Sequence, residues 1–190
     1  SLMRTDSLTL LSKSSLDRPA FSGAKDSIVE VFSEGKRMVY YYGEVSVEYQ
    51  DMKLTADYME YDMNSGTVFA RGTLDTLTGE WIGQPKMTQG KDTYEMEELR
   101  YNFNSGKARI TNMITNDDEG KLHGRDIKML EDRSINIKNG KYTVCDAEHP
   151  HYYLSLSSAK VITKPSQKTV FGPAWPVIED VIVPIAIPFG

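Results

Sequence analysis

The fold is decided by the stretch MEYDMNSGTVFA at residues 59–70, which returns 40 residues later as LRYNFNSGKARI at residues 99–110. Each copy places the polar triplet Asn-Ser-Gly between two segments in which apolar and polar residues alternate. Asn and Gly tolerate the positive φ that tight hairpin turns require. Each stretch therefore predicts a β-hairpin, made of a strand, a tight turn and a return strand.

A weaker third unit follows at residues 127–137, and Asn139-Gly140 gives a further turn signal. Repeated hairpins are typical of stacked units that bury one continuous face against their neighbours. In Leu54 to Tyr61 the apolar positions slip from even to odd numbers, which predicts a β-bulge near Asp57 or Tyr58. The sequence thus predicts an all-β solenoid or open roll.

Outside the repeat, we predict strands at residues 141–144, 152–156 and 159–163, with residues 145–150 as a loop. Residues 1–27 form a flexible lead-in, residues 28–164 the folded domain, and residues 165–190 a proline-rich connector. The sequence begins without a signal peptide and contains no apolar run of membrane-spanning length. Because it stops within an apolar segment, we expect a further domain to follow.

Composition and motifs argue against two classes of function. A net charge of -5 with no long Lys/Arg run argues against nucleic-acid binding, which needs a concentrated basic face. The chain has no GxSxG, HExxH or phosphate-binding glycine loop. Acidic neighbours on a strand point to opposite faces and cannot act on one bond. We therefore expect a binding module that is not an enzyme and needs no cofactor.

The densest cluster of reactive side chains surrounds the single cysteine, Cys145, with His149 and His151 close by in the sequence. These residue types can ligate zinc or form a thiol nucleophile with a histidine base, although the paired spacing of zinc ligands is absent. The alternative favoured by the spacing is a loop between strands, with Cys145 buried as a small apolar residue.

The 11 tyrosines allow three interpretations: sheet packing, stacking on sugars, or the lining of an apolar groove. Packing is the simplest. An open roll nevertheless leaves its interior accessible from one side, where an acyl chain could lie.

Three stretches together resemble the OstA superfamily of lipopolysaccharide transport proteins. The first two are Gly43 to Glu48 leading into Leu54-Thr55-Ala56-Asp57, and Ala70-Arg71-Gly72. The third is Tyr142-Thr143-Val144-Cys145 with His149-Pro150-His151 and the proline-rich end, and it is similar to the domain that precedes the outer-membrane barrel in this superfamily. The resemblance covers residues 35–190.

The resemblance implies an open β-jelly roll at the periplasmic face of the outer membrane of a Gram-negative bacterium. Such a roll binds lipopolysaccharide acyl chains without breaking a bond and passes them to a C-terminal β-barrel with a lipoprotein plug. An LptA-like bridge protein would pair with its edge strand, and Cys145 would form a disulfide with the barrel. A soluble LptA-like bridge and a carbohydrate-binding module remain alternatives. The lipid-groove candidates are Val45, Val47, Leu54, Ala56, Val68, Ala70, Leu99, Tyr101, Phe103, Ile110, Ile127 and Ile137.

Overall fold

The structure is a computed structural model that describes residues 18–33, 35–90, 92–117, 120–145, 147, 149–162 and 168–190. Over these residues the chain is all-β, built of antiparallel strands in a jelly-roll-like arrangement, as the hairpin repeat predicted. The strands are β1 (Ala20–Ser22), β2 (Ser27–Ser33), β3 (Lys36–Tyr49), β4 (Met52–Asp62), β5 (Thr67–Arg71), β6 (Thr73–Leu74), β7 (Trp81–Ile82), β8 (Lys86–Gln89), β9 (Asp92–Asn102), β10 (Lys107–Asp117), β11 (Gly120–Met129), β12 (Ile135–Thr143), β13 (Tyr152–Ile162), β14 (Lys168–Phe171), β15 (Ala174–Ile178) and β16 (Val181–Ile182).

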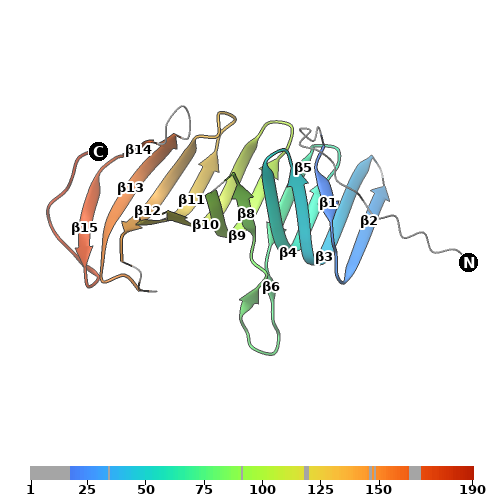
Figure 1. Cartoon of the computed structure of the whole chain (residues 1–190), viewed down its shortest axis with the longest axis horizontal. Coiled ribbons are helices and arrows are strands. Elements are labelled where there is room, and N and C mark those ends of the chain that lie inside the picture. Colours follow the sequence, from blue (N-terminus) through green and yellow to red (C-terminus); the bar gives the residue numbers. More distant parts are fainter. Residues whose placement is uncertain are drawn as a thin grey trace, which may run out of the picture.

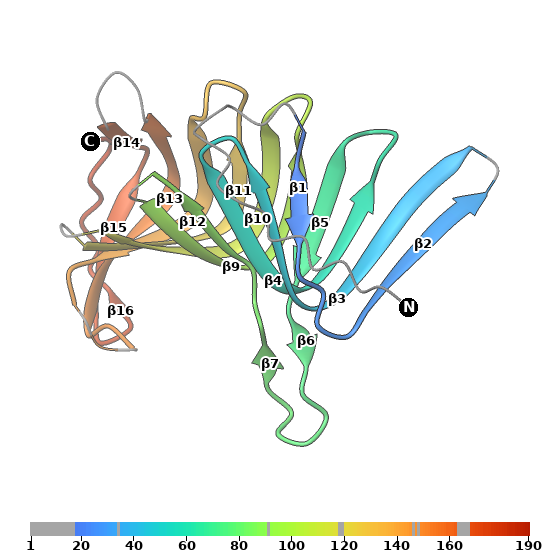
Figure 2. The same ribbon diagram turned by 45° about the vertical axis from the view of Figure 1, so that its right-hand side comes forward.

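One sheet runs through most of the molecule, with the strands side by side along its long axis (Figure 1). From β9 to β13 each strand pairs with the next along the chain. β1 and β2 both pair with β3, at different positions, and β8 lies between β4 and β9. The short strands β6 and β7 form a separate ribbon that projects from the body (Figures 1 and 2).

A crease crosses the sheet and folds it into two leaves. On β3, Gly43 and Glu44 stand opposite the single residue Asp57 of β4, and both have positive φ. Asn112 on β10 and Asn139 on β12 also have positive φ at positions where the regular pairing is interrupted. The predicted bulge is therefore confirmed in place, but its extra residue belongs to β3. The prediction that Asn139-Gly140 forms a turn is wrong, because both residues lie within β12 at the crease.

The crease also explains why apolar positions change phase within single strands. In β9 the buried residues are Tyr94 and Met96 on one side of the crease, and Leu99 and Tyr101 on the other. With a strict period of two along the whole strand, the apolar side chains of one half would point to the outer face. The slip of one residue at the crease lets the apolar side chains of both halves point into the interior. We call the half with the β3–β4 turn leaf I and the half with the β9–β10 turn leaf II. The apolar core lies between them.

The two Asn-Ser-Gly turns are hairpin turns as predicted, but asparagine has a different role. Only Gly66 and Gly106 have positive φ, whereas Asn64 and Asn104 do not. Each asparagine instead donates its side-chain amide to the turn before it, Asn64 to the carbonyl of Gly35 and Asn104 to that of Ser65 at 2.9 Å. The repeated asparagine therefore ties successive turns together along the rim of leaf II.

The sheet extends past the predicted domain limits at both ends. β1 lies inside the predicted lead-in, whose residues 1–17 are outside the described residues, and β14 to β16 lie inside the predicted connector. Pairing with β3 and β13 holds these strands in place. Residues 141–144 continue β12 as far as Thr143, and the two strands predicted at residues 152–163 form the single strand β13. Alternation cannot distinguish two strands from one strand that crosses a crease.

Candidate functional site: the interior between the leaves

All twelve lipid-groove candidates lie in one buried cluster between the leaves. None exceeds 9% exposure, and Val47, Leu54, Val68, Ala70 and Leu99 are fully buried. They come from both leaves, so the fold brings the predicted residues together across the sheet. Their side chains pack on one another. Their contact with a lipid stays a prediction.

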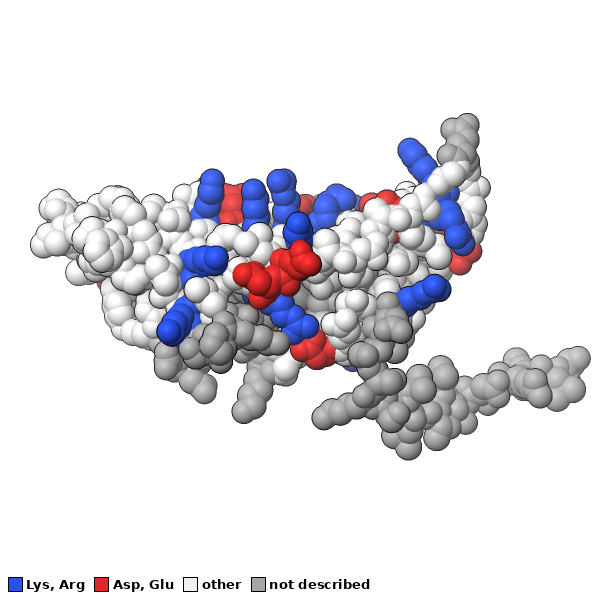
Figure 3. All heavy atoms as spheres, turned by 90° about the horizontal axis from the view of Figure 1, so that it is seen from above, with Lys and Arg blue, Asp and Glu red and all other residues white. Residues whose placement is uncertain are grey.

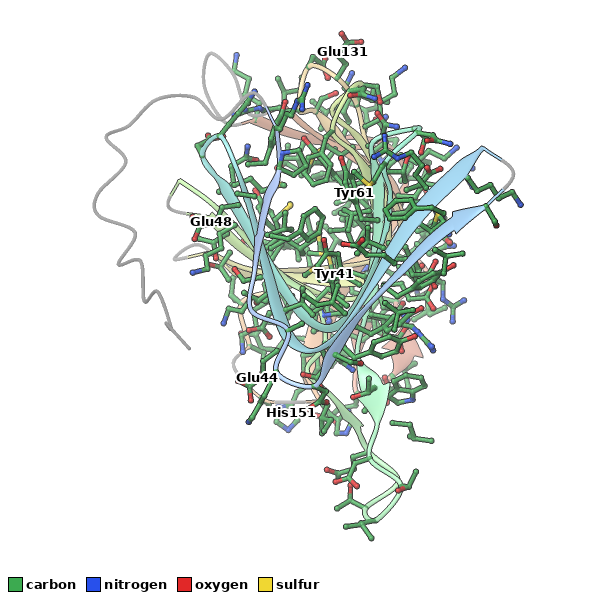
Figure 4. The ribbon with its side chains drawn as sticks, turned by 90° about the vertical axis from the view of Figure 1, so that its right-hand side faces the viewer. Tyr41, Glu44, Glu48, Tyr61, Glu131 and His151 are labelled. Carbon is green, nitrogen blue, oxygen red and sulfur yellow. The ribbon has the colours of Figure 1, made fainter. Side chains whose placement is uncertain are left out.

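The end of the interior nearest the N-terminus is filled by aromatic rings. Phe21 of β1 stacks on Tyr41 at 4.7 Å between ring centroids and lies 4.8 Å from Tyr61. Tyr61 in turn contacts Phe103, which contacts Tyr49 from leaf I. Viewed from this end, Tyr41 and Tyr61 lie between the two leaves (Figure 4). Burial and the nearby Glu30 carboxylate raise the pKa of Tyr41, so its phenol stays protonated.

A cavity of about 240 Å³ lies between the open rims of the leaves. Its walls come from the β3–β4 turn and β8 on leaf I, and from the β9–β10 and β11–β12 turns on leaf II. Met52, Met87 and Met129 with the rings of Tyr101 and Phe103 give it an apolar floor, and polar side chains surround its opening. The polar group consists of Gln50, Gln89, Asn104, Ser105, Glu131 and Arg133.

An ion pair joins the two rims beside this cavity. The Arg133 guanidinium on leaf II donates to both carboxylate oxygens of Asp51 on leaf I, at 3.2 and 3.3 Å. Burial alone would raise the pKa of Asp51, but hydrogen bonds from Gln89 and Arg133 outweigh it and lower that pKa. Tyr49 also donates to the backbone carbonyl of Phe103 at 3.5 Å. We call the Asp51–Arg133 pair the clasp.

Both turns that carry the clasp contain backbone strain. Gln50 beside Asp51 has φ 54°, and Arg133 itself has φ 63°. A residue with a side chain in this left-handed region costs about 1–2 kcal/mol, and such strain is often found where a ligand or a moving element is held. The clasp has no local signal in the sequence, because its two residues are 82 positions apart.

At the N-terminal end of the sheet, both faces and one edge of β2 are exposed to solvent. All seven of its residues are exposed, including Ile28, Val31 and Phe32. Among the described strands it pairs only with β3. An exposed apolar edge strand is a template for pairing with another chain.

Cys145 is half-buried in the loop after β12, so the expectation of a buried apolar cysteine is wrong. Its Sγ lies 3.8 Å from Nδ1 of His151. A backbone hydrogen bond from Ala147, together with His151, lowers the pKa of the thiol, and the same contact with Cys145 and the charge of Glu179 raise the pKa of His151. His149 has no described contact with the thiol. Among the described residues no group of three His, Cys, Asp or Glu side chains could hold a metal ion.

Asp57, the last residue of the Leu-x-Ala-Asp motif, stabilises the crease. Its carboxylate accepts hydrogen bonds from the backbone N–H of Glu44 at 3.3 Å and from the hydroxyl of Thr73 at 2.8 Å. Its own N–H donates to the carbonyl of Gly83 at 2.8 Å. This motif residue therefore has a structural role at the fold's bend, away from the rims where the cavity opens.

Two surface features could not be predicted from the sequence, because each depends on how the folded strands place their side chains. The outer face of leaf II brings Arg100, Arg109 and Lys128 directly opposite one another on neighbouring strands, with Lys160 two strands further on. Seen from above, Lys and Arg side chains form a row along one long edge of the molecule (Figure 3). The projecting ribbon exposes Leu77 almost completely and Trp81 by half.

The fold and its interior define a class: an all-β, jelly-roll-like sheet that is folded along a crease around an apolar core. A search of protein-family models and of curated proteins found no match to this chain. The described part of the chain has no helix that is long and apolar enough to cross a membrane.

Proposed function

We propose that this chain is a non-enzymatic conduit that binds the acyl chains of lipopolysaccharide between its leaves and passes them to an outer-membrane barrel. The observation that carries the proposal is the continuous apolar face, which the crease turns inward in successive strands from β3 to β13. A surface of this kind can accept acyl chains at any point along its length when the rims separate. A conduit needs this property, whereas an enzyme needs one fixed reacting centre.

The motifs quoted from the sequence support a more specific form of the proposal. They resemble the periplasmic N-terminal domain of the lipopolysaccharide assembly protein LptD, which acts at the periplasmic face of the outer membrane with a lipoprotein plug in its barrel. The exposed strand β2 suits pairing with an LptA-like bridge protein, because main-chain hydrogen bonds along a free edge give affinity. A soluble LptA-like bridge is the alternative within the same pathway.

Cys145 fits the disulfide partner that the resemblance implies. A thiolate attacks a disulfide faster than a thiol does, and the nearby His151 favours the thiolate. We expect His151→Ala to slow the reaction of Cys145 with oxidised glutathione at pH 7 several-fold. The rate of mixed-disulfide formation, followed by mass spectrometry, measures this. An unchanged rate would show that His151 does not activate the Cys145 thiol.

Photo-cross-linking to lipopolysaccharide tests the conduit, and the residue next to each interior position serves as its outward-facing control. A photoreactive amino acid at Val47, Tyr101 or Ile137 faces the interior, whereas at the neighbours Glu48, Arg100 and Lys138 it faces outward. We expect lipopolysaccharide to be captured at the first three positions and not at the second three. Tyr101 is the most informative position, because an aromatic photoreactive residue replaces an aromatic ring and preserves the packing. Equal capture at Tyr101 and Arg100 would refute the proposal.

A further inference from the structure

The ribbon of β6 and β7 is attached to the crease by close contacts that fix its direction. At its base, the Asp57 carboxylate accepts the hydroxyl of Thr73, and the Asp57 N–H donates to the carbonyl of Gly83, both at 2.8 Å. A Cβ at Gly72 would lie 2.6 Å from the carbonyl oxygen of Ile82, and one at Gly83 would lie 2.2 Å from the Asp57 carboxylate carbon. Only glycine fits at these two positions. The base therefore holds the ribbon against the crease, on the side of the molecule opposite the rim turns (Figures 1 and 2).

The ribbon exposes apolar side chains on both of its faces and at its tip, residues 75–80. Leu74 and Trp81 stand directly opposite each other and share one face, whereas Ile82 lies on the other face. Each of these three side chains is about half exposed, and Leu77 at the tip is 95% exposed. A groove on another protein covers one face of a hairpin, but a lipid surface surrounds a hairpin that inserts into it. The distribution of apolar side chains therefore fits a lipid surface better than a groove.

The backbone of the tip forms its hydrogen bonds within the ribbon. The N–H of Asp75 donates to the carbonyl of Glu80, and that of Gly79 donates to the carbonyl of Asp75, both at 2.8 Å. The N–H of Leu77 donates to the Asp75 carboxylate at 2.8 Å. The N–H of Glu80 donates to the hydroxyl of Thr78 at 3.3 Å. Because an unpaired N–H is costly to move out of water, these hydrogen bonds lower the cost of placing the tip in a membrane interface.

The charges of the ribbon indicate the kind of lipid surface. Asp75 and Glu80 are the charged residues of β6, β7 and the turn between them, and the whole chain has a net charge of -5. Anionic headgroups would repel both carboxylates. The indole of Trp81 combines an apolar body with one N–H donor, which suits the headgroup region of a bilayer. A surface of neutral phospholipids therefore matches the ribbon.

We propose that the ribbon is a membrane contact, in which Leu77 inserts into the interfacial region of a neutral phospholipid surface and Leu74 and Trp81 lie at the level of the headgroups. The proposal goes beyond the conduit, because it assigns the attachment to a surface on the opposite side of the molecule from the rims. The crease side faces the lipid in this arrangement, and the rims and the free edge of β2 stay accessible.

Phosphatidylcholine vesicles test this contact with the 190-residue chain. The chain has two tryptophans, so Trp175→Phe leaves Trp81 as the single fluorescent indole. On addition of vesicles, we expect the Trp81 emission to shift to shorter wavelength and to be quenched by lipids brominated on the acyl chain near the headgroup. Leu77→Ala should weaken vesicle binding about tenfold, the lower end of what a leucine side chain contributes on leaving water.

Ile28→Ala is the matched control, because Ile28 is an exposed aliphatic residue on β2. It should leave vesicle binding unchanged. Both changes are at the surface, so neither should lower the melting temperature by more than about 1–2 °C. Sedimentation of the chain that retains Trp175 with the same vesicles repeats the comparison without the reporter substitution. Equal losses of binding for Leu77→Ala and Ile28→Ala would refute the role of the ribbon.

Two other outcomes would also overturn the proposal. An unchanged Trp81 emission, with no quenching by brominated lipid, would refute insertion and leave a groove on another protein as the partner of the ribbon. Tighter binding after part of the phosphatidylcholine is replaced by phosphatidylglycerol would refute the neutral surface. The conduit is tested separately, since cross-linking of lipopolysaccharide to Tyr101 concerns the interior, and either proposal can fail while the other stands.

Discussion

The central hairpins and the first hairpin are built from the same alternating pattern but differ in what lies opposite them. In β9 and β10 the inward side chains meet the other leaf, and Leu99 and Ile110 are almost completely buried. In β2 every residue is exposed, although Ile28 and Phe32 are as apolar as their central counterparts. Within the part of the chain that the structure describes, the short strand β1 is what leaf I adds at this end, through its pairing with β3.

The central hairpins bury their inward side chains against the opposite leaf and pair with strands on both sides, whereas the first hairpin has little of either. An isolated two-stranded hairpin is marginally stable in water. The apolar side chains of β2 are therefore available for another chain, whereas those of β9 already contribute to the core. Three pairs of substitutions test this difference.

The largest effect is expected from truncating a core side chain. Leu99→Ala removes a fully buried side chain and should lower the free energy of unfolding by about 2–5 kcal/mol. Phe32→Ala, at the exposed end, should cost less than about 1 kcal/mol, mostly from its contact with the Arg37 guanidinium. Urea denaturation of both variants measures the difference. A comparable loss for Phe32→Ala would show that the first hairpin belongs to the core.

A smaller difference is expected between two glycines with the same φ of 79°. At Gly35, in the tip of the first hairpin, an added Cβ meets nothing within 4 Å, so Gly35→Ala should cost about 1–2 kcal/mol from the backbone alone. At Gly43, in the crease, the Cβ would lie 2.7 Å from a carboxylate oxygen of Asp26 and 3.1 Å from its backbone nitrogen. We expect Gly43→Ala to cost about 1 kcal/mol more than Gly35→Ala. Thermal unfolding of the two variants provides the measurement, and equal costs would mean that the crease can relax around a side chain.

The smallest effect concerns the asparagines that tie the turns together. Asn104→Ala removes a hydrogen bond to the turn at Ser65 and should cost about 1 kcal/mol. Asn64→Ala removes the bond to Gly35, and it should cost about half as much in global unfolding because the first hairpin opens locally. Hydrogen exchange of the amides near each turn separates local from global opening. A larger global cost for Asn64→Ala would contradict the difference between the two regions.

The hairpins could be predicted because turn residues and alternation are local properties. The bulge opposite Asp57 was visible because the apolar positions of β4 change phase within eight residues. Tyr94 and Met96 before Leu99 and Tyr101 show the same change of phase in β9. The role of Asn104 was mistaken, since its partner Ser65 belongs to another turn. The clasp and the rim cavity could not be predicted, because Asp51 and Arg133 meet only after the sheet has folded.

The crease has a consequence for the reach of the molecule. Each strand from β9 to β12 crosses the crease, and each hairpin ends in a turn at a rim. Successive hairpins therefore have the same cross-section. Neighbouring strands lie about 4.8 Å apart, so one inserted hairpin would lengthen the molecule by about 10 Å and leave the width of the interior unchanged. The distance spanned between two anchored surfaces can therefore change in whole steps through duplication of a short stretch of sequence.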